Sequence, residues 1–181
     1  MWTPVATFLH GSVPSGAALT KFGAMTDSTP SPFTDEDVRF MRMALQEAER
    51  AAELDEVPVG AVIVAQGQVI ARAHNLCEQL RDFTAHAEMQ AFTSASEYLG
   101  GKFLDKCTLY VTLEPCPMCA GAAFWTRIGR VVYGAQDEKR GHSKFDGPLT
   151  MLHPKTTCQG GLLAEEAAAL LTNFFRAKRN A

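Results

Sequence analysis

From residue 34 onward, the chain alternates between segments with a helical spacing of apolar residues and segments with the composition of β-strands. A first helix is predicted from Thr34, where a capping hydroxyl and three acids precede apolar residues three and four positions apart, to about Leu54. Further helices are expected over 85–99, 116–125 and 164–178, strands over 59–64, 69–73, 108–113 and 130–134, and loops over 75–84 and 136–157. This alternation predicts a layered α/β fold, in which the hairpin over 59–73 makes the sheet mixed rather than purely parallel.

The composition is that of one globular domain. The 181 residues are 46% hydrophobic and 20% charged, which excludes disordered, collagen-like and coiled-coil chains. There is no run of about 18 apolar residues, so no membrane partner is expected. With 17 Lys and Arg against 20 Asp and Glu, the net charge is −3, and a nucleic acid would have to bind through a local basic patch.

Residues 1–33 have the composition of a tail. They hold four prolines and only two charged residues, Lys21 and Asp27. We interpret them as an N-terminal extension outside the fold, either a flexible leader or a start codon placed too early, ahead of one domain over 34–181. The segment from Trp2 to Leu9 carries no charge and soon meets Gly11 and Pro14, which does not fit a secretory signal.

Two of the five cysteines form a C-x-x-C at Cys116 and Cys119, and His86 stands at the start of an earlier predicted helix. This cysteine usage indicates metal or redox chemistry in a reducing, cytoplasmic location. Residues i and i+3 of a helix face the same way, and the helix N-terminus favours the thiolates that bind metals. Three ligands leave a fourth position for water, as in catalytic zinc sites.

Glu88 follows His86 by two residues, in the first helical turn, where both side chains can face one site. Zinc lowers the pKa of a bound water to about 7, and a carboxylate that is not a ligand can pass the proton to a substrate nitrogen. His86-Ala87-Glu88 followed by Pro115-Cys116-Pro117-Met118-Cys119 is the H-x-E…P-C-x-x-C signature of zinc-dependent base deaminases. The signature predicts hydrolytic deamination with Zn²⁺ as the cofactor.

Two other classes of protein share parts of this pattern. Dithiol redox proteins of the thioredoxin type also carry a C-x-x-C after a strand, and zinc can be purely structural. The redox interpretation gives His86 and Glu88 no role, and no fourth Cys or His is spaced to complete a structural zinc site. The remaining cysteines, Cys77, Cys107 and Cys158, are left outside the site.

Several runs of sequence around these motifs closely resemble the bacterial tRNA-specific adenosine deaminases. The resemblance covers roughly Val38 to Arg179, and its runs are Glu56–Val62, Thr84–Glu88, Leu109–Cys116, Cys119–Ala122, Arg127–Ala135 and Phe174–Arg176. It implies a homodimer of the three-layer α/β/α cytidine deaminase-like fold, with a mixed sheet of about five strands. It also implies conversion of adenosine to inosine at the wobble position of a tRNA anticodon arm.

The same resemblance assigns residues that bind the substrate. In that family an asparagine eleven residues before the zinc histidine contacts the base, and Asn75 stands at that position. Val57 and the backbone of Ala87 would line the same pocket. The family's usual proline before its T-A-H-A-E run is replaced here by Phe83, whose ring could stack on a splayed base or merely reshape the loop.

Candidate RNA contacts lie in two further segments. The loop over 136–157 departs from the best-known family members, and the last helix ends without an acid after Glu166. Basic side chains at a helix end suit the helix dipole, and they also suit phosphate contact. The candidates in these segments are Lys139, Arg140, Lys144, Phe174, Arg176, Lys178 and Arg179.

The sequence leaves two alternatives to a tRNA deaminase open. Free-base or nucleoside deaminases for guanine or cytosine share the zinc motif, and Pro117-Met118 with Phe124-Trp125 is similar to the guanine enzymes. The runs Arg127–Ala135 and Phe174–Arg176 favour the tRNA enzymes instead. The alternative outside enzymes is an RNA-binding module, but binding alone would not need Glu88.

Glu114 follows the strand over 108–113 and precedes the Cys116 ligand by two residues. It is interpreted either as a second acid near the metal or as a side chain fixed at the strand end by hydrogen bonds. His142, in the basic run of the long loop, is expected to be solvated.

Overall fold

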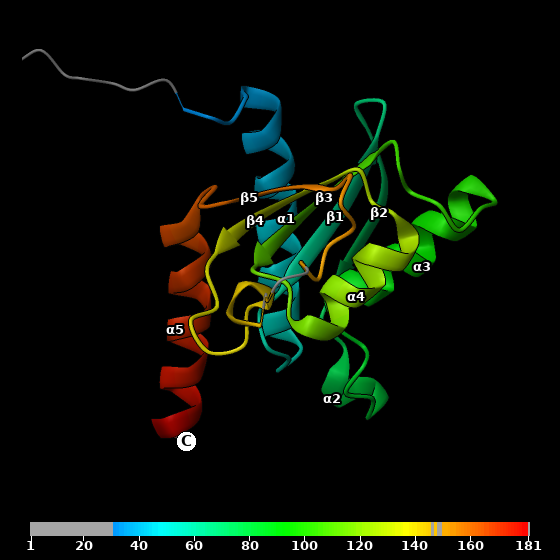
Figure 1. The fold of residues 1–181 in the computed structure, drawn as a ribbon. Coiled ribbons are helices and arrows are strands. Elements are labelled where there is room, and N and C mark those ends of the chain that lie inside the picture. Colours follow the sequence, from blue (N-terminus) through cyan, green and yellow to red (C-terminus); the bar gives the residue numbers. More distant parts are fainter. Residues whose placement is uncertain (1–30, 146, 148–149, 181) are drawn as a thin grey trace, which may run out of the picture. The chain divides into compact units, whose positions relative to one another are not determined.

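The computed structural model describes residues 31–145, 147 and 150–180, so nearly all of the proposed extension over 1–33 lies outside the described residues. In chain order the elements are α1 (Asp35–Glu53), β1 (Gly60–Ala65), β2 (Gln68–His74), α2 (Cys77–Leu80), α3 (Ala87–Leu99), β3 (Cys107–Leu113), α4 (Pro117–Thr126), β4 (Arg130–Ala135), the 3₁₀ turn η1 (His142–Lys144), β5 (Thr157–Gly160) and α5 (Ala164–Asn180). Figure 1 shows their arrangement.

The five strands form one mixed sheet in the order β2-β1-β3-β4-β5. β1 pairs antiparallel with β2 and β3, whereas β3, β4 and β5 run parallel. The predicted α/β class and the mixed sheet are therefore confirmed. Neither α2 nor β5 was predicted: α2 lies in the segment over 75–84 that was expected to be a loop, and β5 lies almost entirely between the expected loop over 136–157 and the expected helix over 164–178.

Helices cover both faces of the sheet, which gives three layers (Figure 1). Alternate residues of β1, β3 and β4 enter different cores, so that Ile63 of β1 packs in one apolar cluster with residues of α3 and α4, and Val62 packs in another with residues of α1. α5 contacts α1, β3 and β4. Gly60 allows the close approach of α1, because a Cβ there would lie 2.1 Å from the carbonyl oxygen of Ala44.

The start of α1 is fastened by a buried acid. Thr34 and Asp37 form a capping box, in which each side chain accepts a hydrogen bond from the other's backbone. The Asp37 carboxylate also accepts hydrogen bonds from Arg130 at 2.6 Å and Tyr110 at 2.7 Å. Burial raises the pKa of Asp37, but these donors outweigh it and hold the pKa well below its ordinary value.

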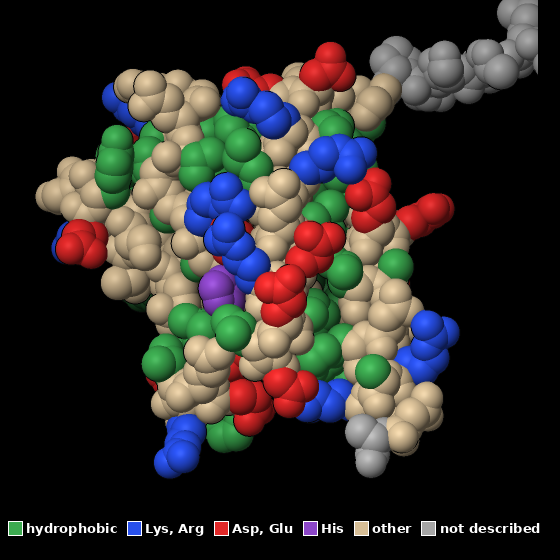
Figure 2. All heavy atoms as spheres, turned by 180° about the vertical axis from the view of Figure 1, so that it is seen from behind, with side chains coloured by type: hydrophobic (Ala, Val, Ile, Leu, Met, Phe, Trp, Pro, Cys, Tyr) green, Lys and Arg blue, Asp and Glu red, His purple; other side chains and the backbone are tan. Residues whose placement is uncertain are grey.

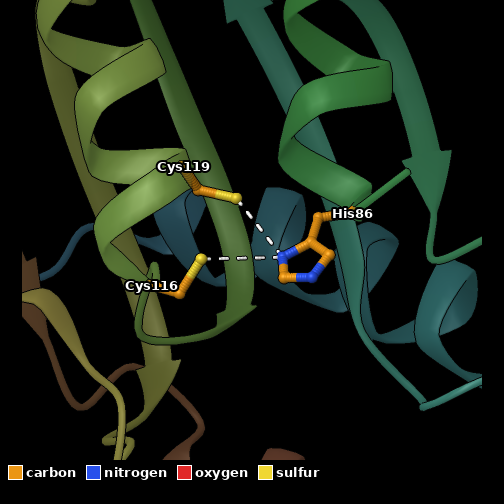
Figure 3. A group of neighbouring side chains, drawn as sticks. All are labelled: His86, Cys116 and Cys119. Carbon is orange, nitrogen blue, oxygen red and sulfur yellow. Dashed lines mark hydrogen bonds between the residues drawn. The ribbon is translucent and has the colours of Figure 1, made fainter. Parts of the chain in front are cut away.

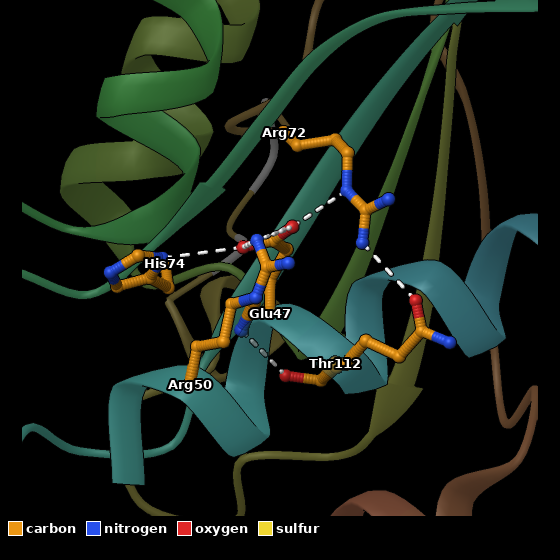
Figure 4. Close-up of polar contacts among 7 residues, drawn as sticks. Glu47, Arg50, Arg72, His74 and Thr112 are labelled. Atoms are coloured by element: carbon orange, nitrogen blue, oxygen red, sulfur yellow. Dashed lines mark hydrogen bonds and ion pairs between the residues drawn. The ribbon is translucent and has the colours of Figure 1, made fainter. Parts of the chain in front are cut away.

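A second buried acid joins α1 to β2. Glu47 accepts hydrogen bonds from Arg72 at 2.6 Å and Arg50 at 3.2 Å, and it lies 3.3 Å from His74 Nδ1 (Figure 4). Asp37 and Glu47 thus both connect the helix layer to the sheet.

On the face seen in Figure 2, Lys and Arg side chains gather beside a histidine and are bordered by Asp and Glu. Among the described residues, no helix is long and apolar enough to cross a bilayer.

Candidate active site

The three predicted ligands meet between the first turns of two helices (Figure 3). His86 Nδ1 lies 3.5 Å from Cys119 Sγ and 3.7 Å from Cys116 Sγ. The three ligand atoms all lie within 4.8 Å of one another. Among the described residues, Cys77, Cys107 and Cys158 do not belong to this group of three ligands.

Local chain geometry explains why these residues converge. His86 is the N-cap of α3 and Cys116 is the N-cap of α4, both with extended backbone, so the helices begin one or two residues later than predicted. Pro117 takes the first helical position, where its missing N–H costs nothing. Cys119 follows within the first turn, so its thiol faces the same way as that of Cys116.

The donor set fits a soft or borderline metal ion. Hydrogen bonds from the Cys119 thiol and His86 lower the pKa of Cys116 to about 4, so this sulfur is a thiolate at neutral pH. The same contact raises the pKa of Cys119, so the two sulfurs share one proton in the absence of a metal. Two thiols and an imidazole are zinc ligands, and three of them leave one coordination position open.

Glu88 lies in the first turn of α3, beside this group. Its side chain is 4% exposed, and burial raises the pKa of its carboxyl group. The carboxyl contacts the Cys119 thiol without belonging to the three-ligand group. A buried acid with a raised pKa, placed beside a metal group, is suited to take up and release a proton during a reaction.

A cavity of about 310 Å³ opens next to the metal group and is lined mainly by apolar surface. Both Asn75 and Val57 line it, as does Phe83, whose side chain is 90% exposed at the rim. Ala87 is fully buried and is absent from the lining. The lining consists of Val57, Val59, Asn75, Cys77, Glu78, Phe83, His86, Glu88, Leu113, Glu114, Cys116, Asp137 and Arg140.

A fully buried acid that sequence reasoning missed orients Asn75. The Glu56 carboxylate accepts a hydrogen bond from Asn75 Nδ2 at 3.0 Å and from the backbone N–H of Gln79 at 2.8 Å. The Cys77 thiol donates to Asn75 Oδ1 from 3.4 Å. Because a carboxylate can only accept, the nitrogen of the Asn75 amide must face Glu56.

Comparison with known proteins identifies the family to which this chain belongs. The profile of MafB19-like deaminases matches residues 35–179. The tRNA-specific adenosine deaminase of Agrobacterium fabrum is 47% identical over 149 residues, which are 80% of this chain and 97% of that protein. The chain belongs to the tRNA-specific adenosine deaminase family.

Solved structures agree with this assignment. A structure from studies of A-to-I editing by tRNA:A34 deaminases at the wobble position of transfer RNA is 46% identical, with a TM-score of 0.69, over 74% of this chain and 99% of that chain. The guanine deaminase of Nitrosomonas europaea is 25% identical, with a TM-score of 0.64, over 76% of this chain and 83% of that chain. Deaminases of different substrates thus share this fold.

In this member of the tRNA-specific adenosine deaminase family, two predicted RNA contacts, Phe83 and Arg140, line the cavity. Arg140 lines it, while Lys139 and Lys144 are exposed on the same loop. The candidates on α5, which do not line the cavity, are Phe174, Arg176, Lys178 and Arg179. Lys178 forms a 2.5 Å ion pair with Asp55, which precedes the lining residue Val57 by two positions.

Glu114 is fixed at the strand end, as one of its two interpretations expected. Its buried carboxylate accepts hydrogen bonds from the backbone N–H groups of Asp137 and Ser143, both at 3.1 Å. The expectation for His142 was wrong. That side chain is 6% exposed, because its Nδ1 lies 3.3 Å from Glu114 and its ring packs edge-on to Tyr133.

Proposed function

We propose that the protein converts adenosine to inosine at the wobble position of a tRNA anticodon by hydrolytic deamination. The observation that carries this proposal is the buried Glu88 beside the His86, Cys116 and Cys119 group, inside a cavity that can hold a base. A base can reach such a cavity when it is unstacked from its neighbours. The anticodon loop supplies adenosine in single-stranded form, which suits this requirement.

We propose zinc as the metal of this site, held by His86, Cys116 and Cys119. Zinc with three protein ligands and an open position activates a water near neutral pH. Glu88 accepts a proton from the attacking water and delivers it to N1 of the adenine. It then takes the remaining proton of that oxygen, now bonded to C6, and donates it to the leaving amino group, so that one water is consumed, the C6–N bond is replaced by C6–O, and ammonia leaves.

The cavity wall supplies groups that can orient the base. Asn75 is held at both ends of its amide, and Val57 offers an apolar surface beside it. Ala87, at the start of α3, is fully buried and outside the cavity lining, so it is not among the proposed contacts. Phe83 is proposed to stack on a neighbouring base, since its ring is almost fully exposed at the cavity rim.

The proposed RNA surface extends from the cavity to both basic segments. Arg140, Lys139 and Lys144 follow β4 on the cavity side, and the last turn of α5 adds Lys178 and its neighbours. Guanidinium and ammonium groups of this kind bind phosphates whatever the base sequence. The two segments can therefore hold the anticodon arm while the cavity selects the base.

A free-base deaminase is the second candidate, favoured by the structural similarity to a guanine deaminase.

The deciding experiment incubates zinc-loaded protein with an anticodon stem-loop that carries adenosine at the wobble position. Matched reactions contain the same stem-loop with guanosine there, free guanine or free cytosine. Inosine by mass spectrometry in the first reaction alone supports the proposal. Ammonia from a free base, without inosine in the RNA, contradicts it.

We also propose that the enzyme is a homodimer in the reducing cytoplasm, where the ligand thiols stay reduced. Trp125 at the end of α4 is 77% exposed, and Phe103 is 45% exposed nearby, in contact with Arg127. Large exposed apolar groups of this kind mark association surfaces. The Trp125→Glu variant is expected to shift the mass measured by light scattering from two chains to one. A wild-type mass of one chain contradicts the dimer.

A further inference from the structure

The Glu114 carboxylate lies in the cavity wall, but no step of the proposed reaction uses it. Its side chain is 0% exposed. Oε2 accepts a hydrogen bond from the backbone N–H of Asp137, and Oε1 accepts one from Ser143, both at 3.1 Å. Because each oxygen already accepts a backbone N–H group, this carboxylate suits anchoring better than proton transfer.

The two amides that Glu114 holds are the two ends of one loop. Residues 137–144, named the rim loop here, turn back on themselves, since Asp137 Oδ1 accepts the N–H groups of Lys139 and Arg140, both at 2.9 Å. The backbone N–H of His142 donates to the carbonyl oxygen of Pro115 at 2.9 Å. The rim loop is thus tied to the short segment that leads from β3 to the metal ligand Cys116.

Gly141 gives independent evidence that the loop closes around this carboxylate. A Cβ atom at Gly141 would lie 2.1–2.6 Å from the carboxylate carbon and both oxygens of Glu114. These distances are far inside van der Waals contact, and the buried carboxylate cannot move without losing its hydrogen bonds. Only glycine therefore fits where the loop backbone passes over Glu114.

The rim loop carries the positive charge closest to the cavity. Arg140 and Asp137 line the cavity, and Lys139 and Lys144 are exposed beside them. On a chain with a net charge of −3, an RNA phosphate needs such a local basic group in a fixed position. A loop held at both ends presents these side chains without an ordering cost at each binding event.

We propose that Glu114 is a positioning residue that holds the rim loop in the shape that binds RNA phosphates beside the cavity. The proposal rests on the proposed function for its substrate, but the anchoring of the loop is independent of the RNA. Glu114 acts on binding through Arg140 and its neighbours. Glu114 takes no part in the proton transfers, which Glu88 carries out.

The test uses Glu114→Gln in the zinc-loaded protein, with Glu97→Gln as its matched control. The glutamine has the same shape, but its NH₂ group faces one of the two backbone N–H groups, so one hydrogen bond is lost. Glu97 is exposed near the end of α3 and lies outside both the rim loop and the cavity lining, so its variant removes an equal charge without touching the anchor or the proposed RNA surface.

The expected result is a split between KM and kcat. In Glu114→Gln, KM for the wobble-adenosine stem-loop rises about tenfold, kcat stays within about threefold, and zinc content is unchanged. The slope of log KM against log salt becomes shallower by about 0.7 for each phosphate that the variant no longer binds. Glu97→Gln keeps KM within about twofold. Equal KM values in the two variants, or a loss confined to kcat, overturn the proposal.

Gly141→Ala and amide exchange keep the test valid if Glu114→Gln folds poorly. Gly141→Ala strains the same anchor from the loop side, so it should raise KM in the same way. In free protein, exchange at Asp137 and Ser143 is expected to be at least about tenfold faster in Gly141→Ala than in wild type. An unchanged exchange rate at these two amides would contradict the anchoring role of Glu114. If wild type makes no inosine, the proposed function fails while exchange still decides the role of Glu114.

Discussion

The Glu56→Gln variant should turn the side chain of Asn75 around. The Glu56 carboxylate accepts two N–H groups, one from Asn75 Nδ2 and one from the backbone of Gln79. A glutamine side chain in its place can still accept the Gln79 N–H through Oε1, but its Nε2 then faces Asn75 Nδ2 across 3.0 Å. Two donors cannot pair, so Asn75 is expected to rotate, present its oxygen to the introduced amide nitrogen and lose the hydrogen bond from Cys77.

The size of the effect follows from these hydrogen bonds. Loss of one hydrogen bond to a buried charged acceptor costs about 1.5–3 kcal/mol of unfolding free energy, which urea denaturation of the zinc-loaded protein can measure. If Asn75 orients the base, an amide turned the wrong way lowers kcat/KM for the stem-loop about tenfold to a hundredfold. Glu53→Gln is the control, because Glu53 is exposed a few residues earlier, and it should change neither quantity measurably.

A double-mutant cycle decides whether Glu56 acts through Asn75. If it does, Glu56→Gln should have no further effect on kcat/KM once Asn75 is replaced by alanine. Additive losses, or a Glu56→Gln variant with kcat/KM within about twofold of wild type, would refute the reasoning.

Three other perturbations test the fold and the metal group. Gly60→Ala should cost about 1–3 kcal/mol in urea denaturation, because its Cβ overlaps α1, whereas Gly121→Ala, with open space around it, should not destabilise the protein. Cys119→Ser should abolish stoichiometric zinc in elemental analysis, while Cys158→Ser, at an exposed position, should retain it; equal zinc in both would contradict the ligand assignment. The depressed pKa of Asp37 means that its contribution to stability is complete above the unfolded-state value of 3.8 and is lost as pH falls through the lower folded-state pKa. Asp37→Asn should therefore flatten the fall in unfolding free energy below about pH 4, and an unchanged slope would contradict it.

The motifs that bind the metal could be predicted from sequence because they depend on local geometry. His86 and Cys116 each stand just before a helical pattern, so their place at a helix start follows from the chain itself. Glu88 could be assigned with them, since two residues separate it from His86. These positions need no knowledge of which distant segments meet.

The buried acids could not be predicted in the same way. Glutamate is usually a surface residue, so nothing in the sequence marks Glu56 and Glu114 as buried. They are buried because N–H groups from distant segments donate hydrogen bonds to their carboxylates. α2 has four residues and β5 has four, which is too short for a periodic pattern. β5 exists because its backbone pairs with β4, a contact that only the tertiary fold supplies.

The most direct test of the account compares Glu88→Gln with wild type on the wobble-adenosine stem-loop, with zinc content measured in the same samples. General acid–base catalysis contributes about a hundredfold to ten-thousandfold, so the variant should retain wild-type zinc and lose inosine formation by a factor in that range. Glu97→Gln, at an exposed position near the end of α3, should behave like wild type. A Glu88→Gln protein that holds zinc and forms inosine within about tenfold of the wild-type rate would contradict the central claim.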